Sequence, residues 1–130
     1  MKAVDTNILV RWITRDDPVQ SPLADQVMRT PVYVPLTVLI ELAWVLRGEP
    51  YNMTRGALTQ SLRLLVDLST VTVPLEDAVR WAIDRHENGA DFADMVHLIE
   101  SRRTDAFLSF ERRLAKLAGP DAPVPVERVA

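Results

Sequence analysis

Short apolar runs alternate with longer stretches of helical periodicity, and this alternation constrains the fold more than any other feature of the chain. The short runs predict strands at residues 2–4, 32–34, 71–73, 106–108 and, at an edge, 124–126. The longer stretches predict helices at 8–14, 21–29, 36–47, from residue 54 onward, 74–87, 91–102 and 110–118. Strands separated by helices pair in parallel through right-handed crossovers. The sequence therefore predicts an α/β fold in which helices cover both faces of a parallel sheet of four to five strands.

Length and composition favour one ordinary globular domain. The chain has 130 residues, of which 48% are apolar, and its mean hydropathy is close to zero. No repeat or dividing linker interrupts it, so we expect a single domain over residues 1–130. Cysteine is absent, which excludes disulfides and thiolate metal sites, and His86 and His97 are too few and too scattered for a zinc cluster.

The start of the chain and its apolar runs predict a cytoplasmic protein. The first ten residues lack the long apolar core and the small-residue cleavage site of a signal peptide. No run of about eighteen apolar residues occurs, so we expect no membrane-spanning segment.

The basic residues are almost all arginine, although the net charge is −3. Arginine suits bidentate contacts to phosphate, but this charge balance excludes a protein that coats nucleic acid by charge alone. A nucleic acid partner would instead be bound by a few arginines at one place on the surface. Arg11, Arg15 and Arg47 lie near the predicted ends of strands and are candidates for phosphate contacts, and the alternative for each is a solvated helix face.

Acidic residues occur where predicted strands end or helices begin. Asp5 ends the first strand, and Glu41 lies in the early turns of the helix after the second. Asp91 and Asp94 begin a later helix, and Glu111 comes directly after the fourth strand. Ligands of open α/β sheets gather outside the carboxyl ends of the strands. We therefore expect these carboxylates to collect at one edge of the sheet.

Glu41 is the most informative of these acids. It is the only acid in an apolar helix, where burying a carboxylate would be costly without a partner. The alternative is that Glu41 lies near the helix start and interacts favourably with the helix dipole.

The other acids also have interpretations without chemistry. Residues 5–7, Asp-Thr-Asn, could be no more than a helix cap. Asp91 could likewise cap a helix that has Asp94 in its first turn. Glu111 could form a solvated pair with Arg112 or Arg113.

A cluster of carboxylates predicts a bound cation. Carboxylates within a few ångströms of one another repel and raise each other's pKa, so they are compatible mainly around a positive ion. Oxygen ligands on loops and helix starts suit Mg²⁺ or Mn²⁺. Two such ions about 4 Å apart activate water and stabilise the leaving oxygen of a phosphodiester. The acids therefore predict metal-assisted phosphodiester hydrolysis, with no histidine base or cysteine nucleophile.

Four segments resemble the signature segments of PIN-domain ribonucleases, specifically the VapC-type toxins of bacterial toxin-antitoxin pairs. They are VDTNILV, TVLIELAWVL, GADFADMVHLIE and AFLSFERRLAKLAG, in the right order and spacing over nearly the whole chain. The resemblance implies a three-layer α/β/α sandwich and an RNA-cleaving Mg²⁺ or Mn²⁺ site. It assigns the metal ligands and catalytic acids to Asp5, Glu41, Asp94 and Glu111, and supporting roles to Thr6, Asn7, Asp91 and Ser109.

The chain departs from this family pattern at two positions. Glu111 stands where aspartate is usual, so it could reach a second metal through water or hold none, and Ser109 stands where threonine is commoner. The other three acids are intact, which predicts activity.

The resemblance also implies two protein partners, a cognate antitoxin and a second copy in a homodimer. Trp12 and Trp44 could line an apolar groove for a partner, because tryptophan is enriched in interface cores, or could belong to the protein core. Two rival functions remain open. One is a non-catalytic binding module with the same fold. The other is a receiver-like signalling domain, which neither Lys2 nor Lys116 is placed to support.

Overall fold

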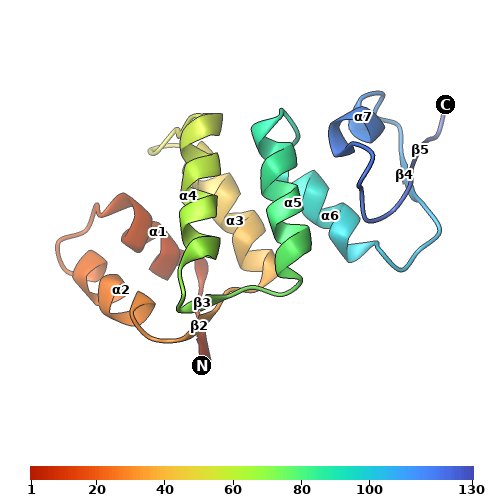
Figure 1. Ribbon diagram of the computed structural model, residues 1–130. Helices are drawn as coiled ribbons and strands as arrows, with labels where there is room; N and C mark the ends of the chain where they lie inside the picture. The colour runs from red at the N-terminus through yellow and green to blue at the C-terminus, as the bar shows by residue number, and fades with distance from the viewer. The chain divides into compact units, whose positions relative to one another are not determined.

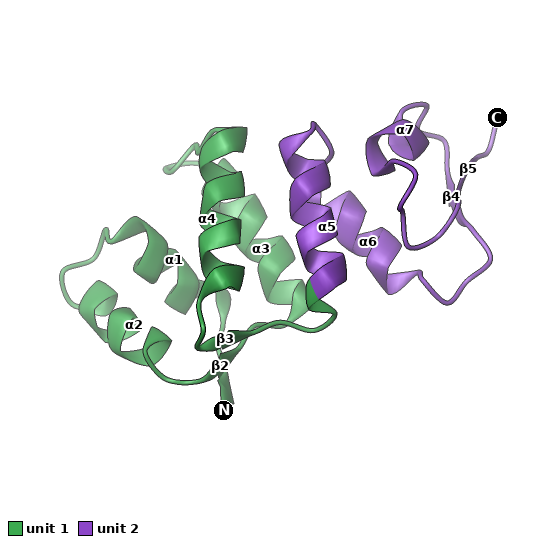
Figure 2. Cartoon of the chain, viewed as in Figure 1, with its two compact units in different colours: residues 1–76 green, residues 77–130 purple.

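The computed structural model describes all residues, 1–130. It contains seven helices and five short strands (Figure 1). The chain divides into two compact units, Met1–Glu76 and Asp77–Ala130 (Figure 2). None of the helices has the length and apolar character needed to cross a membrane.

The first unit is built on a parallel sheet of three strands, β1 (Lys2–Ala3), β2 (Val32–Tyr33) and β3 (Val71–Thr72). Strand β2 lies in the middle, with Val32 opposite Lys2 on one side and Val71 on the other. The ladder continues past the strand ends, because Val4 N donates to Tyr33 O over 3.1 Å and Val34 N donates to Thr72 O over 2.9 Å. Val32 and Val34 are fully buried, which fits a central strand.

Four helices complete this unit. They are α1 (Thr6–Thr14), α2 (Gln20–Met28), α3 (Leu36–Arg47) and α4 (Arg55–Asp67). Helix α1 packs against α2 and α3, and α3 packs against α4. The leucines of α3 and α4 recur at helical spacing on one face of each helix and form the core of the unit. Its fully buried leucines are Leu9, Leu39, Leu42, Leu46, Leu58, Leu62 and Leu65.

The second unit contains three helices and a parallel pair of strands. The helices are α5 (Glu76–Glu87), which starts one residue before this unit, α6 (Phe92–Glu100) and α7 (Leu114–Ala118). Strands β4 (Phe107–Ser109) and β5 (Val126–Arg128) pair in register, with Ser109 opposite Arg128. The buried His86 lies edge-on to Phe92, with ring centroids 6.4 Å apart.

The predicted α/β class and the parallel pairing of five strands are confirmed. The strands are grouped as three and two, because β4 forms its ladder with the C-terminal strand. Phe107 N donates to Pro125 O, and Val129 N donates to Ser109 O, each over 2.8 Å. Strand β5 begins at Val126 rather than at 124, because Pro125 has no N–H to donate.

Several predicted helix starts were wrong. Helix α1 begins at Thr6 rather than at residue 8, because Asp5 is its N-cap. Helix α2 begins at Gln20, where Asp17 accepts from the amides of Val19 and Gln20, so Ser21 is not the cap. Helix α7 is shorter than predicted and begins at Leu114, because the chain bends at residue 110.

Two leucines of α4 offer a matched test of this core. Leu62 is fully buried, whereas Leu64 is 58% exposed. We expect Leu62→Ala to lower the free energy of unfolding by about 2–5 kcal/mol, because it leaves a cavity. Leu64→Ala is expected to change it by no more than about 0.5 kcal/mol. Urea unfolding of both variants measures the difference, and equal losses would contradict the described orientation of α4.

Candidate functional site

Asp5 combines a structural role with an available carboxylate oxygen. It follows β1 and caps α1, with Oδ1 accepting from Ile8 N over 3.2 Å. The residue is exposed, and Oδ2 has no hydrogen-bond partner in the protein. The capping interpretation is therefore right for one oxygen, while the second remains available to a ligand.

The two residues after Asp5 differ in their surroundings. Thr6 is buried, and its Oγ1 has no hydrogen-bond partner within the protein. Asn7 is exposed. Neither of them caps α1. A buried hydroxyl without a partner is unusual and is a group that a ligand or a bound water beside Asp5 would satisfy.

Glu41 lies on the exposed face of α3, so the argument from burial was wrong. The buried face of this helix is formed by leucines and Ala43, whereas Glu41 is exposed and points away from the core. Trp44, three residues further on, is 78% exposed, which excludes its placement in the core. Trp12 is half-buried. The exposed face of α3 thus presents a carboxylate and an indole together.

Asp91 and Glu111 of the second unit both affect Asp94 electrostatically. Asp91 caps α6 by accepting from Asp94 N over 2.9 Å, as the capping interpretation predicts. Partial burial raises the pKa of Asp94, and the nearby Asp91 and Glu111 raise it further, while His97 lowers it. At the end of β4, Ser109 Oγ accepts from Glu111 N over 3.0 Å, which fixes the chain that carries Glu111.

The predicted metal ligands divide between the units. Asp5 and Glu41 lie on the adjacent helices α1 and α3 of the first unit, and Asp94 and Glu111 interact within the second. Neither unit alone brings three acidic or histidine side chains together as a metal site. The donors are all oxygen atoms, which is the chemistry that Mg²⁺ and Mn²⁺ prefer. The unpartnered hydroxyl of Thr6 and the free Oδ2 of Asp5 fit such an ion and its waters.

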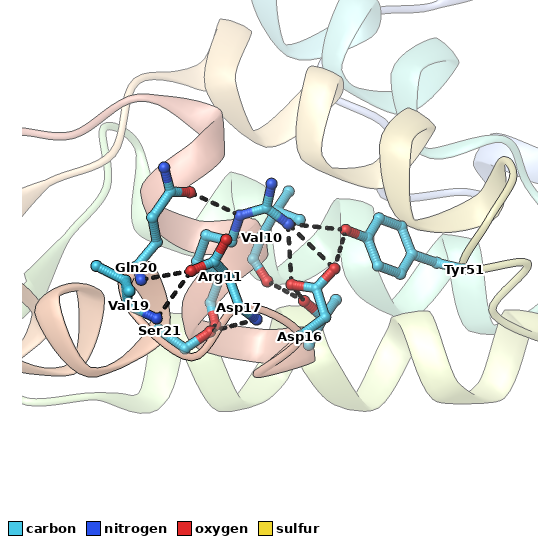
Figure 3. Close-up of polar contacts among 9 residues, drawn as sticks. Val10, Arg11, Asp16, Asp17, Val19, Gln20, Ser21 and Tyr51 are labelled. Carbon is cyan, nitrogen blue, oxygen red and sulfur yellow. Dashed lines mark hydrogen bonds and ion pairs between the residues drawn. The ribbon is translucent and has the colours of Figure 1, made fainter.

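Arg11 is the centre of a hydrogen-bond network that the sequence analysis missed (Figure 3). Its Nη1 donates to both oxygens of Asp16, over 2.9 and 3.0 Å, and to the hydroxyl of Tyr51 over 3.3 Å. Its Nε donates to Gln20 Oε1 over 2.9 Å. Tyr51 is 40 residues from Arg11 in the chain, so no local spacing pattern could have identified it.

Asp16 is strongly held as an anion in this network. Hydrogen bonds from the Tyr51 hydroxyl (2.6 Å) and the Thr14 hydroxyl (2.8 Å), followed by the Arg11 guanidinium, lower the pKa of Asp16 to about 2. Arg15 is similarly occupied, since its two terminal nitrogens pair with the two oxygens of Asp25 over 2.9 and 2.7 Å. Of the three candidate phosphate-binding arginines, Arg47 has no acidic partner.

A hollow of about 240 Å³ lies beside α1 and α2, next to Asp5. Its lining residues are Asp5, Asn7, Ile8, Arg11, Gln20, Leu23, Ala24 and Val27. The first unit therefore places the capping carboxylate and the anchored guanidinium of one helix around the same hollow.

Comparison with protein families identifies the chain. The family model described as PIN domain matches residues 2–120, which include all four predicted metal ligands. The chain belongs to the PIN domain family. No curated protein and no solved structure matches it. PIN domains are generally nucleases and typically depend on metal ions, and the α/β fold with parallel strands agrees with the expected α/β/α sandwich.

The Arg11 network predicts a pH-dependent contribution to the stability of the PIN domain. Because the pKa of Asp16 falls from its ordinary 3.8 to about 2 on folding, its carboxylate stabilises the folded state fully above pH about 4. This contribution is lost as the pH falls toward 2. We expect Asp16→Asn to lower the urea midpoint at pH 7, and the difference from wild type to shrink between pH 4 and 2.

The control for this measurement is Asp121→Asn, which alters an exposed carboxylate that makes no hydrogen bond. Its urea midpoint should follow that of wild type at every pH. A deficit of Asp16→Asn that is the same at pH 7 and pH 2 would contradict the assigned network.

Proposed function

We propose that this PIN domain is a metal-dependent endoribonuclease and acts as the VapC-type toxin of a toxin-antitoxin pair. The PIN match over residues 2–120 is the observation that carries the nuclease proposal. The four segments that resemble VapC-type toxins support the finer assignment. In this proposal the two compact units are parts of one domain over residues 1–130, and the protein works in the cytoplasm.

The proposed metal ligands are Asp5, Glu41, Asp94 and Glu111, with Thr6, Asn7, Asp91 and Ser109 as supporting residues. Asp5 retains a free oxygen while its other oxygen caps α1, so its position is set by the helix. Asp91 and Ser109 act similarly in the second unit, since each accepts a backbone N–H from the chain that carries a proposed ligand. These contacts support a preorganised set of carboxylates.

A bound Mg²⁺ or Mn²⁺ would supply a Lewis acid that activates water and stabilises the leaving oxygen of the phosphodiester. Asp5, Glu41, Asp94 and Glu111 would hold that ion through their carboxylate oxygens. Partial burial, and after it the negative charges of Asp91 and Glu111, raise the pKa of Asp94, and a bound cation would offset both effects. Arg47, which lacks an acidic partner, is the best candidate among the three arginines for an RNA phosphate.

The proposed partners are an RNA substrate, a cognate antitoxin and a second copy of the chain. The exposed Trp44 beside Glu41 supports a protein contact near the proposed site, because a large exposed indole is typical of interface cores. An antitoxin bound there would cover the carboxylate and block the metal site.

Cleavage of a total small-RNA pool tests the nuclease. We expect discrete products from the wild-type protein with Mg²⁺ or Mn²⁺, and none with EDTA. Asp94→Asn should lower the cleavage rate by at least about 100-fold, since even outer-shell changes at metal sites cost 10–100-fold. Asp121→Asn, prepared identically, should cleave like wild type because its carboxylate is exposed and makes no hydrogen bond.

Binding of Mn²⁺ gives a readout that does not depend on cleavage. We expect Mn²⁺ to raise the melting temperature of wild type and to have a much smaller effect on Asp94→Asn. Without metal, Asp94→Asn should melt no lower than wild type, since it removes a charge that partial burial, Asp91 and Glu111 all disfavour. A folded wild-type protein that binds Mn²⁺ but leaves every RNA intact would favour the non-catalytic binding module.

A further inference from the structure

Phe110 is the most exposed aromatic side chain of the second unit, at 78%. It lies at the bend that follows β4. On one side of it, Ser109 O accepts from Val129 N over 2.8 Å. On the other side, Glu111 N donates to Ser109 Oγ over 3.0 Å. The phenyl ring is therefore presented to solvent from a bend whose backbone is held by hydrogen bonds.

Three basic residues follow Phe110 in the chain and form a basic surface: Arg112, Arg113 and Lys116. All three are exposed, and none has an acidic partner in the protein. The solvated pair that Glu111 could form with Arg112 or Arg113 is therefore absent. Residues 110–118 carry these three positive charges and one negative charge, although the whole chain has a net charge of −3. Local positive charge of this kind is typical of a surface that binds an anionic partner.

Helix α7 holds this basic surface in place. The helix buries Leu114 and Ala118 and packs against β5. A fourth cation lies at its C-terminal end, because Arg85 of α5 donates from Nε to Leu117 O over 2.7 Å and from Nη2 to Lys116 O over 3.4 Å. A guanidinium at this end interacts favourably with the helix carbonyls and adds to the positive charge of the region.

The position of Glu111 connects this surface to the proposed metal site. Glu111 lies between Phe110 and Arg112 in the chain, and its negative charge acts on Asp94. Consecutive Cα atoms are only about 3.8 Å apart. An RNA with one phosphate at a cation on Glu111 and Asp94 would therefore have the next part of its strand within side-chain reach of Phe110 and Arg112.

An exposed aromatic ring beside a basic surface is the combination that binds single-stranded nucleic acid. The ring stacks on a base while the basic groups follow the backbone, and arginine suits bidentate contacts to phosphate. We propose that Phe110 stacks on a base of single-stranded RNA next to the cleaved bond, and that the basic surface binds the flanking phosphates. This inference rests on the proposed ribonuclease function. It predicts no preference for a particular base, because every base has a face that can stack.

A protein segment is the alternative occupant, and the residues around Phe110 favour RNA over it. The cores of protein interfaces are depleted of serine, glutamate and lysine. Phe110 is flanked in the chain by Ser109 and Glu111, and Lys116 follows on α7. A strand of RNA supplies phosphates for the basic residues, and the cation that it shares with Glu111 would neutralise that carboxylate.

Binding measured without catalysis tests the aromatic part of the site. The parent protein is Asp94→Asn in EDTA, and the probe is a short labelled oligouridine. We expect Phe110→Ala to weaken binding roughly 5- to 150-fold, which is the range for the loss of one stacked base. Phe110→Trp should keep the affinity because it keeps a stacking face. Leu108→Ala removes a neighbouring apolar side chain that is 62% exposed and should bind like the parent.

A chain of ribose phosphates without bases separates stacking from phosphate contacts. Its affinity should be the same for the parent protein and for Phe110→Ala, because no base is present to stack on the ring.

The salt dependence of binding tests the basic part of the site. Arg112→Gln combined with Arg113→Gln should make the plot of log affinity against log salt less steep by about 1.4, since each phosphate contact with a single strand contributes about 0.7. The control is Arg102→Gln combined with Arg103→Gln, which changes the adjacent exposed arginines that precede β4. It removes the same charge and should leave the slope unchanged. All four arginines are exposed, so both double variants should melt with the parent protein.

Equal binding of oligouridine by Phe110→Ala and its parent would overturn the inference, as would equal salt slopes for the two double variants. Metal-dependent cleavage by the wild type, together with unchanged RNA binding in every variant, would leave the ribonuclease intact and assign this surface to a protein segment. The expected binding pattern without any cleavage would support the RNA surface and overturn the ribonuclease. Absence of both RNA binding and cleavage would overturn both proposals.

Discussion

The parallel register of β1 and β2 is the constraint on which the first unit depends. Lys2 lies opposite Val32 and Ala3 opposite Tyr33, so both strands end at the same edge of the sheet. Helix α1 begins two residues beyond Val4, and α3 begins two residues beyond Val34. The two helix starts therefore leave the sheet side by side, and α1 packs against α3. This places Asp5 and Glu41 on adjacent helices, although 35 residues separate them in the chain.

Two acids of this PIN domain cap helices with one carboxylate oxygen and keep the other oxygen free. Asp5 and Asp91 each accept a backbone N–H at the start of a helix, which satisfies a donor that would otherwise lack a partner. A carboxylate has two oxygens, so one can hold the helix while the other remains available. The alternative interpretations of these acids as caps or as functional groups are therefore compatible. Because one oxygen of each carboxylate is fixed by a helix start, a small domain can hold several acids in defined positions.

Hydrogen bonds to Asp16, Gln20 and Tyr51 fix the position of the Arg11 side chain beside α1 and α2. Arg11 would be a mobile surface side chain without Asp16, Gln20 and Tyr51, which engage two of its three nitrogens. Arg15 is neutralised by Asp25 on the next helix. Two neighbouring arginines of α1 and its cap thus have different surroundings, since one lines a hollow and the other is a paired surface residue.

The sequence by itself determined the α/β class, the positions of the five strands along the chain, their parallel direction and the family of the chain. Those properties depend on local patterns: β-branched runs, helical spacing of leucines such as Leu58 and Leu62, and short signature segments around the acids. Only the tertiary structure decided that Glu41 and Trp44 face solvent, that Tyr51 anchors Arg11, and that the strands are grouped as three and two. Helix α3 is apolar almost all round, so its pattern does not specify which face is buried until α1 and α4 pack against it. Partners forty residues apart and the choice of strand neighbours likewise depend on how the chain folds back on itself, which local spacing does not encode.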